Sequence, residues 1–417
     1  MKILWVKANK LLPVHSGGDI RSYHLARCLS ARHELTFLSY YDGHPDSGYE
    51  AELKKCFPDP QCICTHKGQR LLSRTAGYFA GIRNPLPYAV GRFSSASVKS
   101  ALAQWFEAQS FDVAVCDFLD ATVNFPRNLS IPSVLFQHNV ESEIWRRHAT
   151  TRPNPAGRAI ASLEFRKMLA YEKQTVRKFD HVIAVSDHDR QLMSAWVDDS
   201  RITVVPTGVD LQQYQPGPVK TDPGPLVLFT GAMDWEPNID AVEYFCREIW
   251  PAVQTAIPEA RFRIVGRNPG RRVKNLASTS VEIAGRVRSV VEHLQEALVV
   301  VVPLRIGGGT RLKIYEAMAT GKAVVSTSIG AEGLDVRDGQ DILLADQPGD
   351  FARQTITLLH DRQFRHQIER AAATLASRYD WPVIADKFAE VLQAVVAARM
   401  KQAEPAVGEA VKLGVPA

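Results

Sequence analysis

The sequence is poor in cysteine and has no long apolar run. Six cysteines in 417 residues are too few for a disulfide scaffold, and they predict free thiols in a reducing compartment. No apolar run approaches the roughly 20 residues that a membrane-spanning helix needs. Lys2 and Lys7 interrupt the apolar N-terminus, which predicts a first strand and not a secretory peptide. We therefore expect a cytoplasmic protein.

Two common cofactor signatures are also missing. Cys56, Cys62, Cys64 and His66 lie close together, but their spacing is not that of a zinc site, so no metal is expected. The glycine-rich segment His15–Asp19 is not G-x-G-x-x-G, which disfavours an enzyme that uses NAD. Its two glycines, Gly17 and Gly18, either let backbone N–H groups approach a ligand or form a tight turn with positive φ.

The length and the order of patterns predict two domains. Charged residues make up 23% of the chain and hydrophobic residues 45%, as in a globular protein. Two sets of strand-like runs alternate with helical patterns, which predicts α/β architecture with two doubly wound parallel sheets. Five prolines mark a linker between the sets. The expected parts are a first domain (1–205), the linker (206–225), a second domain (226–385), a terminal helix packing back on the first domain (386–400) and a disordered tail (401–417).

The segment Leu298–Asp335 is the most informative part of the chain. An apolar run ends in the triplet Gly307–Gly309, a helical pattern begins at about Thr310, and a second apolar run follows Gly321. This order predicts strand, glycine loop, helix and strand in a parallel sheet. Open α/β sheets bind ligands beyond the carboxyl ends of their strands, so we expect a ligand at the glycine loop.

Three charged residues on this helix indicate what the ligand is. Arg311 and Lys313 fall in the first turn, where the helix dipole disfavours cations unless an anion such as a diphosphate binds there. The alternative is that both side chains point into water. Glu316, one turn later, can accept hydrogen bonds from the hydroxyls of a ribose, or it is an ordinary solvated glutamate.

Lys313–Val325 resembles the donor-site signature K-I-x-E-A-M-A-x-G-x-x-V-V of the retaining GT-B glycosyltransferases of family 4. The resemblance implies that the helix N-terminus, with Gly309 and Thr310, holds the diphosphate of a nucleotide-sugar and that Glu316 binds the ribose. Many members carry a second glutamate eight positions before the first, where this chain has Gly308, and this departure leaves the choice of sugar open.

The resemblance extends over roughly Met1–Ala398 and implies further donor contacts. The loop that follows Gly231 lacks the arginine and lysine that many members use to bind the diphosphate. Arg311 and Lys313, together with Arg267, would then supply the charge. For Arg267 alone, a structural ion pair explains the residue equally well.

In the first domain the resemblance gives roles to four residues. It implies that the loop with Gly17 and Gly18 faces the donor diphosphate and the acceptor. His138, at the end of a buried strand, would lie beside the donor sugar, although a lone histidine is more often structural. Glu141 would be a helix N-terminal partner or an acceptor contact.

The function implied by the resemblance is retaining transfer of a sugar from a nucleoside-diphosphate sugar to a hydroxyl acceptor, in exopolysaccharide or other cell-surface biosynthesis. His138, Arg311 and Lys313 would carry catalysis without a metal or another cofactor. The alternatives are a small-molecule acceptor and a catalytically silent nucleotide-sugar-binding subunit. No nucleic-acid partner is expected.

The segment 66–100 has six Lys or Arg residues, no Asp or Glu, and interleaved aromatic residues. Such a segment fits an acceptor that carries phosphate, such as a polyprenyl-phosphate-linked glycan, and a peripheral contact with the inner face of a membrane. A solvated, loop-rich face is the alternative.

Overall fold

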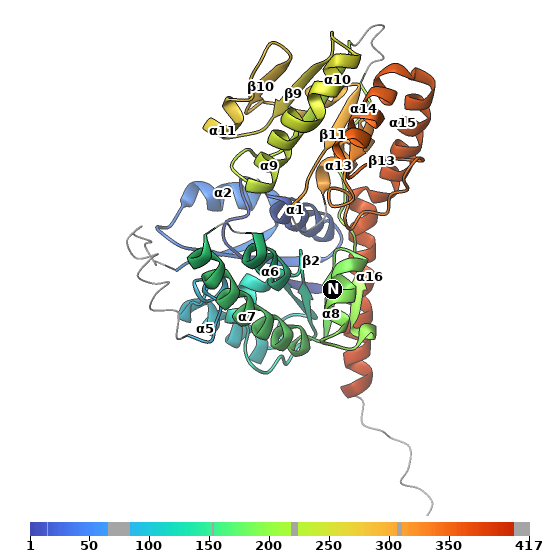
Figure 1. Cartoon of the computed structure of the whole chain (residues 1–417). Coiled ribbons are helices and arrows are strands. Elements are labelled where there is room, and N and C mark those ends of the chain that lie inside the picture. Colours follow the sequence, from blue (N-terminus) through green and yellow to red (C-terminus); the bar gives the residue numbers. More distant parts are fainter. Residues whose placement is uncertain (15, 66–83, 152–153, 218–223, 307–310, 404–417) are drawn as a thin grey trace, which may run out of the picture. The chain divides into compact units, whose positions relative to one another are not determined.

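The computed structural model describes residues 1–14, 16–65, 84–151, 154–217, 224–306 and 311–403 (Figure 1). The chain divides into two compact units. The N-terminal unit comprises Met1–Ala184, Asp189–Val205 and the chain from Ala385, and the C-terminal unit comprises Val185–His188 and Pro206–Ile384. Each unit contains one parallel sheet, so the predicted α/β class with two doubly wound sheets is confirmed.

The N-terminal unit is built on a sheet of seven parallel strands in the order β3-β2-β1-β4-β5-β6-β7. Every residue of β4 and β5 is buried, because helices cover both faces of a parallel sheet. The strands are β1 (Lys2–Ala8), β2 (Glu34–Tyr41), β3 (Asp59–Cys64), β4 (Val113–Asp117), β5 (Ser133–Phe136), β6 (His181–Ala184) and β7 (Ile202–Val204). The helices that precede β8 are α1 (Gly17–Ser30), α2 (Ser47–Cys56), α4 (Tyr88–Gly91), α5 (Ala96–Glu107), α6 (Glu141–Thr151), α7 (Pro155–Lys178) and α8 (Asp187–Ser194).

The C-terminal unit has a sheet of six parallel strands in the order β10-β9-β8-β11-β12-β13. These are β8 (Leu226–Thr230), β9 (Arg261–Val265), β10 (Val281–Gly285), β11 (Val299–Val302), β12 (Ala323–Ser326) and β13 (Leu343–Leu344). The helices are α9 (Glu236–Tyr244), α10 (Trp250–Ala256), α11 (Arg271–Lys274), α12 (Val290–Glu296), α13 (Leu312–Ala319), α14 (Pro348–His360) and α15 (Arg362–Ala376). In both sheets the strand order reverses beside the first strand, and open α/β sheets bind ligands at such a switch point.

The segment expected to be a linker packs on the C-terminal unit over its first residues. Val209 is buried and forms a β-bridge with Asp380. A Cβ atom on Gly208 would lie 2.5 Å from the ring of Trp381, so this position requires glycine. Residues 206–211 are therefore part of the unit, while 218–223 lie outside the described residues.

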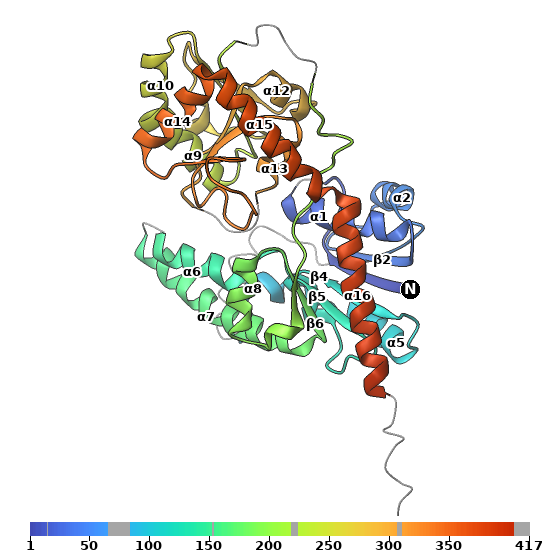
Figure 2. The ribbon, with the colours of Figure 1, turned by 90° about the vertical axis from the view of Figure 1, so that its right-hand side faces the viewer.

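The last helix, α16 (Trp381–Ala403), begins five residues earlier than expected. From Ala385 it belongs to the N-terminal unit, where it passes in front of the strands in Figure 2. The ring of Phe388 lies 5.4 Å from that of Trp5 and 5.1 Å from that of Phe136, measured between centroids. This contact fixes the helix on the sheet by burying aromatic surface. Residues 401–403, which the sequence assigns to a disordered tail, belong to this helix, and the rest of that tail, from residue 404, lies outside the described residues.

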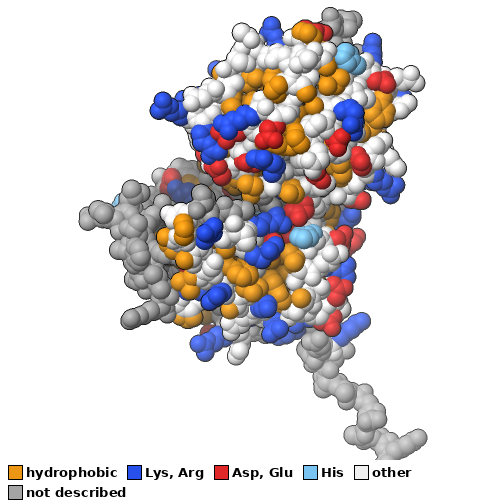
Figure 3. Space-filling model, viewed as in Figure 1, with side chains coloured by type: hydrophobic (Ala, Val, Ile, Leu, Met, Phe, Trp, Pro, Cys, Tyr) orange, Lys and Arg blue, Asp and Glu red, His pale blue; other side chains and the backbone are white. Residues whose placement is uncertain are grey.

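Charged side chains of both signs are intermixed on the face of the molecule drawn in Figure 3. In the C-terminal unit, for example, Arg272 forms ion pairs with Glu236 and Glu243. Among the helices that the structure describes, none combines the length and the apolar character needed to cross a bilayer. Most of the basic segment 66–100 lies outside the described residues, so its contact with a membrane stays a prediction.

Candidate functional site

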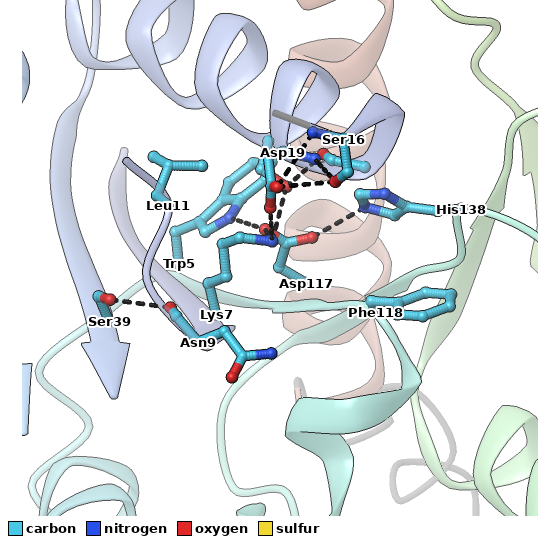
Figure 4. A network of polar contacts seen from close by, with 12 residues as sticks. Trp5, Lys7, Asn9, Leu11, Ser16, Asp19, Ser39, Asp117, Phe118 and His138 are labelled. Atoms are coloured by element: carbon cyan, nitrogen blue, oxygen red, sulfur yellow. Dashed lines mark hydrogen bonds and ion pairs between the residues drawn. The ribbon is translucent and has the colours of Figure 1, made fainter. Parts of the chain in front are cut away.

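The N-terminal unit gathers polar side chains at its topological switch point. Lys7 lies near the end of β1, Asp117 ends β4, and His138 follows β5, so three neighbouring strands deliver these residues to one edge of the sheet. Figure 4 shows their side chains pointing toward one another below the first turn of α1. All three are buried, with Asp117 only 1% exposed.

Asp117 is the centre of this network. The indole Nε1–H of Trp5 donates to Oδ2 of Asp117 over 2.9 Å, and Nε2 of His138 lies 2.8 Å from Oδ1. Lys7 Nζ lies 3.8 Å from Oδ2 and 3.3 Å from Oδ1 of Asp19. Burial raises the pKa of Asp117, but the charge of Lys7 and the hydrogen bond with His138 together lower it by more. The net pKa therefore lies well below the usual range. Asp117 is therefore an ionised carboxylate.

Gly18 allows α1 to approach His138. Ser16 caps the helix through a reciprocal pair of hydrogen bonds with Asp19, which starts the helix at Gly17. A Cβ atom on Gly18 would lie 3.0 Å from Nδ1 of His138. Both glycines have helical backbone, so the requirement at Gly18 is close approach and not a turn with positive φ.

These groups line a pocket of about 360 Å³ within the N-terminal unit. Two of its non-glycine residues, Asn9 and Phe118, have positive φ values of 71° and 75°. Asparagine tolerates positive φ, but the conformation is costly for the bulky Phe118, whose ψ is 165°, and such outliers concentrate at functional sites. Asp120 also lines the pocket, and burial raises the pKa of its carboxyl to about 6. The pocket thus combines hydrogen-bond donors and acceptors in a largely buried setting.

Glu141, the predicted acceptor contact, is not among the residues that line this pocket. It begins α6, and burial, helped by the nearby carboxylates of Asp120 and Glu172, raises its pKa to about 8. Glu172 of α7 accepts hydrogen bonds from the backbone N–H groups of Glu141 and Ser142, over 2.9 and 3.0 Å. Glu172 therefore caps α6, a role that the sequence did not reveal.

In the C-terminal unit the predicted donor residues lie at the start of α13. The helix begins at Leu312, two residues later than expected, so Arg311 is its N-cap and Lys313 lies in its first turn. Nζ of Lys313 lies 2.9 Å from Oδ1 of Asn238 and 4.2 Å from the ring centre of Phe229. Burial, together with the charge of Arg311, lowers the pKa of Lys313 to about 7. The side chain does not point freely into water.

Glu316 is also partly buried and has a specific partner. The hydroxyl of Tyr214 donates to Oε1 of Glu316 over 3.0 Å. Burial raises the pKa of Glu316, and the hydrogen bond from Tyr214 opposes that shift. The reading of Glu316 as an ordinary solvated glutamate is therefore wrong. Gly309 and Thr310, predicted as donor contacts, lie outside the described residues.

Two glycines bring the loops of this unit together. Gly231 directly follows β8, and a Cβ atom there would lie 2.7 Å from Nζ of Lys313 and 2.7 Å from Nδ2 of Asn238. A Cβ atom on Gly266 would lie 1.7 Å from the carbonyl oxygen of Gly231. The next residue, Arg267, lies 3.6 Å from the carboxylate of Asp234, as the structural ion-pair interpretation requires.

Sequence reasoning missed Lys7, Asp117, Asn238 and Tyr214. For Lys7 and Asp117 a signal was present, because a charged residue near the end of an otherwise apolar, buried strand calls for a partner. Tyr214 gave no such signal, because it lies in the proline-rich segment that has no periodicity. Asn238 gave none either, because it is an ordinary position in the first turn of α9 and its contact with Lys313 joins residues far apart in the sequence. Among the residues that the structure describes, no group of three or more His, Cys, Asp or Glu side chains could hold a metal ion.

Comparison with known proteins shows relatives of both units. Residues 15–213 match the family model of Glycosyltransferase Family 4, and residues 224–361 match that of Glycosyl transferases group 1. A D-inositol 3-phosphate glycosyltransferase of Nocardiopsis dassonvillei is 26% identical over 260 residues, 55% of this chain and 59% of the relative. A phosphatidyl-myo-inositol mannosyltransferase of Mycobacterium leprae is 26% identical over 235 residues, 52% of this chain and 60% of the relative. The chain thus aligns with about three fifths of the length of these relatives.

Solved structures share the fold over nearly the whole chain. Anabaena HepE, crystallised with UDP and glucose, has a TM-score of 0.65 at 16% identity, covering 94% of this chain and 100% of HepE. A sucrose-phosphate synthase of Thermosynechococcus elongatus has a TM-score of 0.69 at 16% identity, covering 95% and 100%. At these identities the likeness shows the fold alone, which is GT-B. Together, the two family models and the GT-B fold show that the chain belongs to the group 1, family 4 glycosyltransferases.

Proposed function

We propose that this protein transfers a sugar from a nucleoside-diphosphate sugar to a hydroxyl acceptor with retention of anomeric configuration. The observation that carries the proposal is the group of side chains at the start of α13. Arg311 and Lys313 bring two cations to a helix N-terminus, and burial lowers the pKa of Lys313 toward neutrality. A diphosphate bound there would supply the negative charge that this arrangement favours.

In this proposal Lys313 and Arg311 stabilise the departing diphosphate. Negative charge builds up on the leaving group as the bond to the sugar breaks, and preorganised cations and backbone N–H groups stabilise that charge. Asn238 positions the amine of Lys313 through the hydrogen bond to its Oδ1. Arg267 is a weaker candidate because Asp234 already pairs with it. We expect no divalent metal to be needed.

Glu316 would bind the ribose of the donor. An ionised carboxylate accepts hydrogen bonds from two neighbouring hydroxyls, and Tyr214 leaves Oε2 for that purpose. Gly231 lets the backbone approach the same region, since any side chain there would displace Lys313. HepE, a structural neighbour, was crystallised with UDP and with UDP-glucose, so a uridine nucleotide is the first donor to test.

The N-terminal unit would contribute Gly17, Gly18 and His138 to the donor sugar and acceptor. We place the enzyme in the cytoplasm, in exopolysaccharide or other cell-surface biosynthesis, with peripheral membrane contact through 66–100. The acceptor would carry phosphate, as in a polyprenyl-linked glycan. The names of the curated relatives favour a phosphorylated acceptor too, because they include inositol 3-phosphate and phosphatidylinositol. A small-molecule acceptor is the second candidate.

A thermal-shift panel with UDP, GDP, ADP, TDP and CMP, each with and without EDTA, tests the donor site. We expect one nucleoside diphosphate to raise the melting temperature in EDTA, and Glu316→Ala to remove most of that increase without loss of folding. Glu259→Ala, which removes an exposed glutamate from the same unit, is the matched control and should behave like the wild type.

The same panel separates the outcomes. An increase that requires a metal contradicts the metal-free site, and an increase that survives in Glu316→Ala contradicts the ribose assignment. No increase with any nucleotide contradicts the proposed function. Binding without turnover of any nucleotide-sugar favours the silent-subunit alternative.

A further inference from the structure

We propose that Asp117 is a positioning residue that fixes the tautomer of His138, with the proton on Nε2 and the lone pair of Nδ1 directed into the pocket of the N-terminal unit. It follows that His138 meets a hydroxyl of its ligand and not a phosphate oxygen. The second statement rests on the proposed function, whereas the first concerns this chain alone.

The two carboxylate oxygens of Asp117 serve different partners. Oδ2 accepts from Nε1–H of Trp5 over 2.9 Å and faces Nζ of Lys7 at 3.8 Å. Oδ1 lies 2.8 Å from Nε2 of His138. An ionised carboxylate only accepts hydrogen bonds, so Nε2 must be the donor and must carry the proton.

The imidazole is neutral, so the second nitrogen has a free lone pair. Burial is the largest influence on the pKa of His138 and lowers it; Arg21 and Lys7 lower it further, while Asp117 opposes them. Arg21 and Asp19 come from α1, Lys7 from β1, and Asp117 and Asp120 from β4 and the turn after it. The net direction is downward, which leaves Nδ1 unprotonated at neutral pH.

Nδ1 faces the helix that bounds the pocket. A Cβ atom on Gly18 would lie 3.0 Å from Nδ1, and Gly18 and His138 both line the pocket of about 360 Å³. A neutral nitrogen with a lone pair accepts a hydrogen bond from a hydroxyl but repels a phosphate oxygen, which is itself an acceptor. The geometry therefore matches a sugar hydroxyl.

The substitution Asp117→Asn tests this directly, because the structure dictates how an asparagine must lie. Trp5 is donor-only and Lys7 is a cation, so both require the carbonyl oxygen of the amide on their side. The amide NH2 must then face His138, and Nε2 can accept from it only by losing its proton. Asp117→Asn should therefore move the proton of His138 from Nε2 to Nδ1.

The measurement is ¹⁵N NMR of the full chain labelled at histidine, with the signals of His138 assigned by their loss in His138→Gln. We expect Nε2–H in the wild type and Nδ1–H in Asp117→Asn. Trp5→Phe is the matched control, because it removes the hydrogen bond from the indole to Asp117 and should lower stability while leaving Nε2–H unchanged. Nδ1–H or an imidazolium in the wild type at neutral pH overturns the proposal, even if Asp117→Asn fails to fold. An unchanged tautomer in a folded Asp117→Asn overturns it as well.

Turnover gives a second readout. Asp117→Asn should lower kcat/KM by about 100-fold. Nδ1–H can only donate a hydrogen bond, so it would face the proton of a hydroxyl that is placed to donate to Nδ1. The melting-temperature increase with nucleoside diphosphate should be unchanged, since neither Asp117 nor His138 is among the residues assigned to the diphosphate or the ribose. Wild-type kcat/KM in a variant with the altered tautomer would contradict the hydroxyl assignment. A wild type that binds no nucleotide would contradict the proposed function but leave the NMR test intact.

Discussion

Lys313 illustrates how a single residue gains its properties from its surroundings. The sequence predicted a cation in the first turn of a helix, and the structure confirms that position. The sequence could not reveal that Asn238, 75 residues earlier, holds the amine 2.9 Å away, or that burial lowers its pKa to about 7. Helical spacing is local and can be read from the chain, whereas the approach of α9 to α13 depends on how the whole sheet folds.

The lowered pKa of Lys313 predicts a pH dependence of donor binding. A bound diphosphate favours the charged amine and raises its pKa, so binding above pH 7 takes up a proton. The affinity for a nucleotide-sugar should therefore increase as the pH falls from about 9 to about 7, by at most tenfold per pH unit, and level off below. Isothermal titration in EDTA measures this, and a nucleotide-sugar is preferred because its diphosphate does not titrate in that range.

Two variants are measured alongside the wild type. Lys313→Arg keeps the charge at all of these pH values and should make the affinity nearly independent of pH, while Lys274→Ala removes an exposed lysine from the same unit and should behave like the wild type. A flat profile in the wild type would show that Lys313 does not contact the bound anion.

At the scale of elements, most strands could be predicted because buried parallel strands appear as continuous apolar runs. Residues 239–255 have a helical pattern that predicts a single helix, but a π-helical segment, Phe245–Ile249, separates α9 from α10 there. Pro251 follows that segment, and proline lacks the N–H that a regular helix would use there. The contact between the loops at Gly231 and Gly266 could not be predicted, because it joins residues with no shared periodicity.

That contact leads to a prediction about stability. Gly266→Ala places a methyl group 1.7 Å from the carbonyl oxygen of Gly231, so the two loops must separate. We expect a loss of about 1–3 kcal/mol in the free energy of unfolding, as for other overpacked sites, together with weaker donor binding because Gly231 adjoins Lys313. Gly270→Ala is the matched control, since nothing lies within 4 Å of a Cβ atom there. Urea denaturation of both variants measures the difference, and equal stabilities would contradict the close contact.

At the scale of the whole molecule, the sequence predicted the number of domains better than their limits. The alternation of patterns over 417 residues can be explained only by two sheets, and both are present. The linker was placed less well, because the tertiary contact of Val209 with Asp380 extends the C-terminal unit into its first residues. The terminal helix begins at Trp381 and not at residue 386, but the contact of Phe388 with Trp5 agrees with the predicted packing on the first domain.

The central claim, retaining transfer from a nucleotide-sugar, concerns the whole chain and is tested most directly by ¹H NMR of the reaction itself. Wild-type protein in EDTA is incubated with a nucleotide-sugar that carries the base identified by the thermal-shift panel. The signals of the sugar's anomeric proton are followed from the first minutes. In the absence of another acceptor, water takes the place of the acceptor hydroxyl. We predict slow hydrolysis to nucleoside diphosphate and free sugar, with the sugar appearing first in the anomeric configuration that it has in the donor, and no hydrolysis above background by Glu316→Ala. First appearance of the opposite anomer, or no release by a protein that binds the nucleotide, would contradict the account.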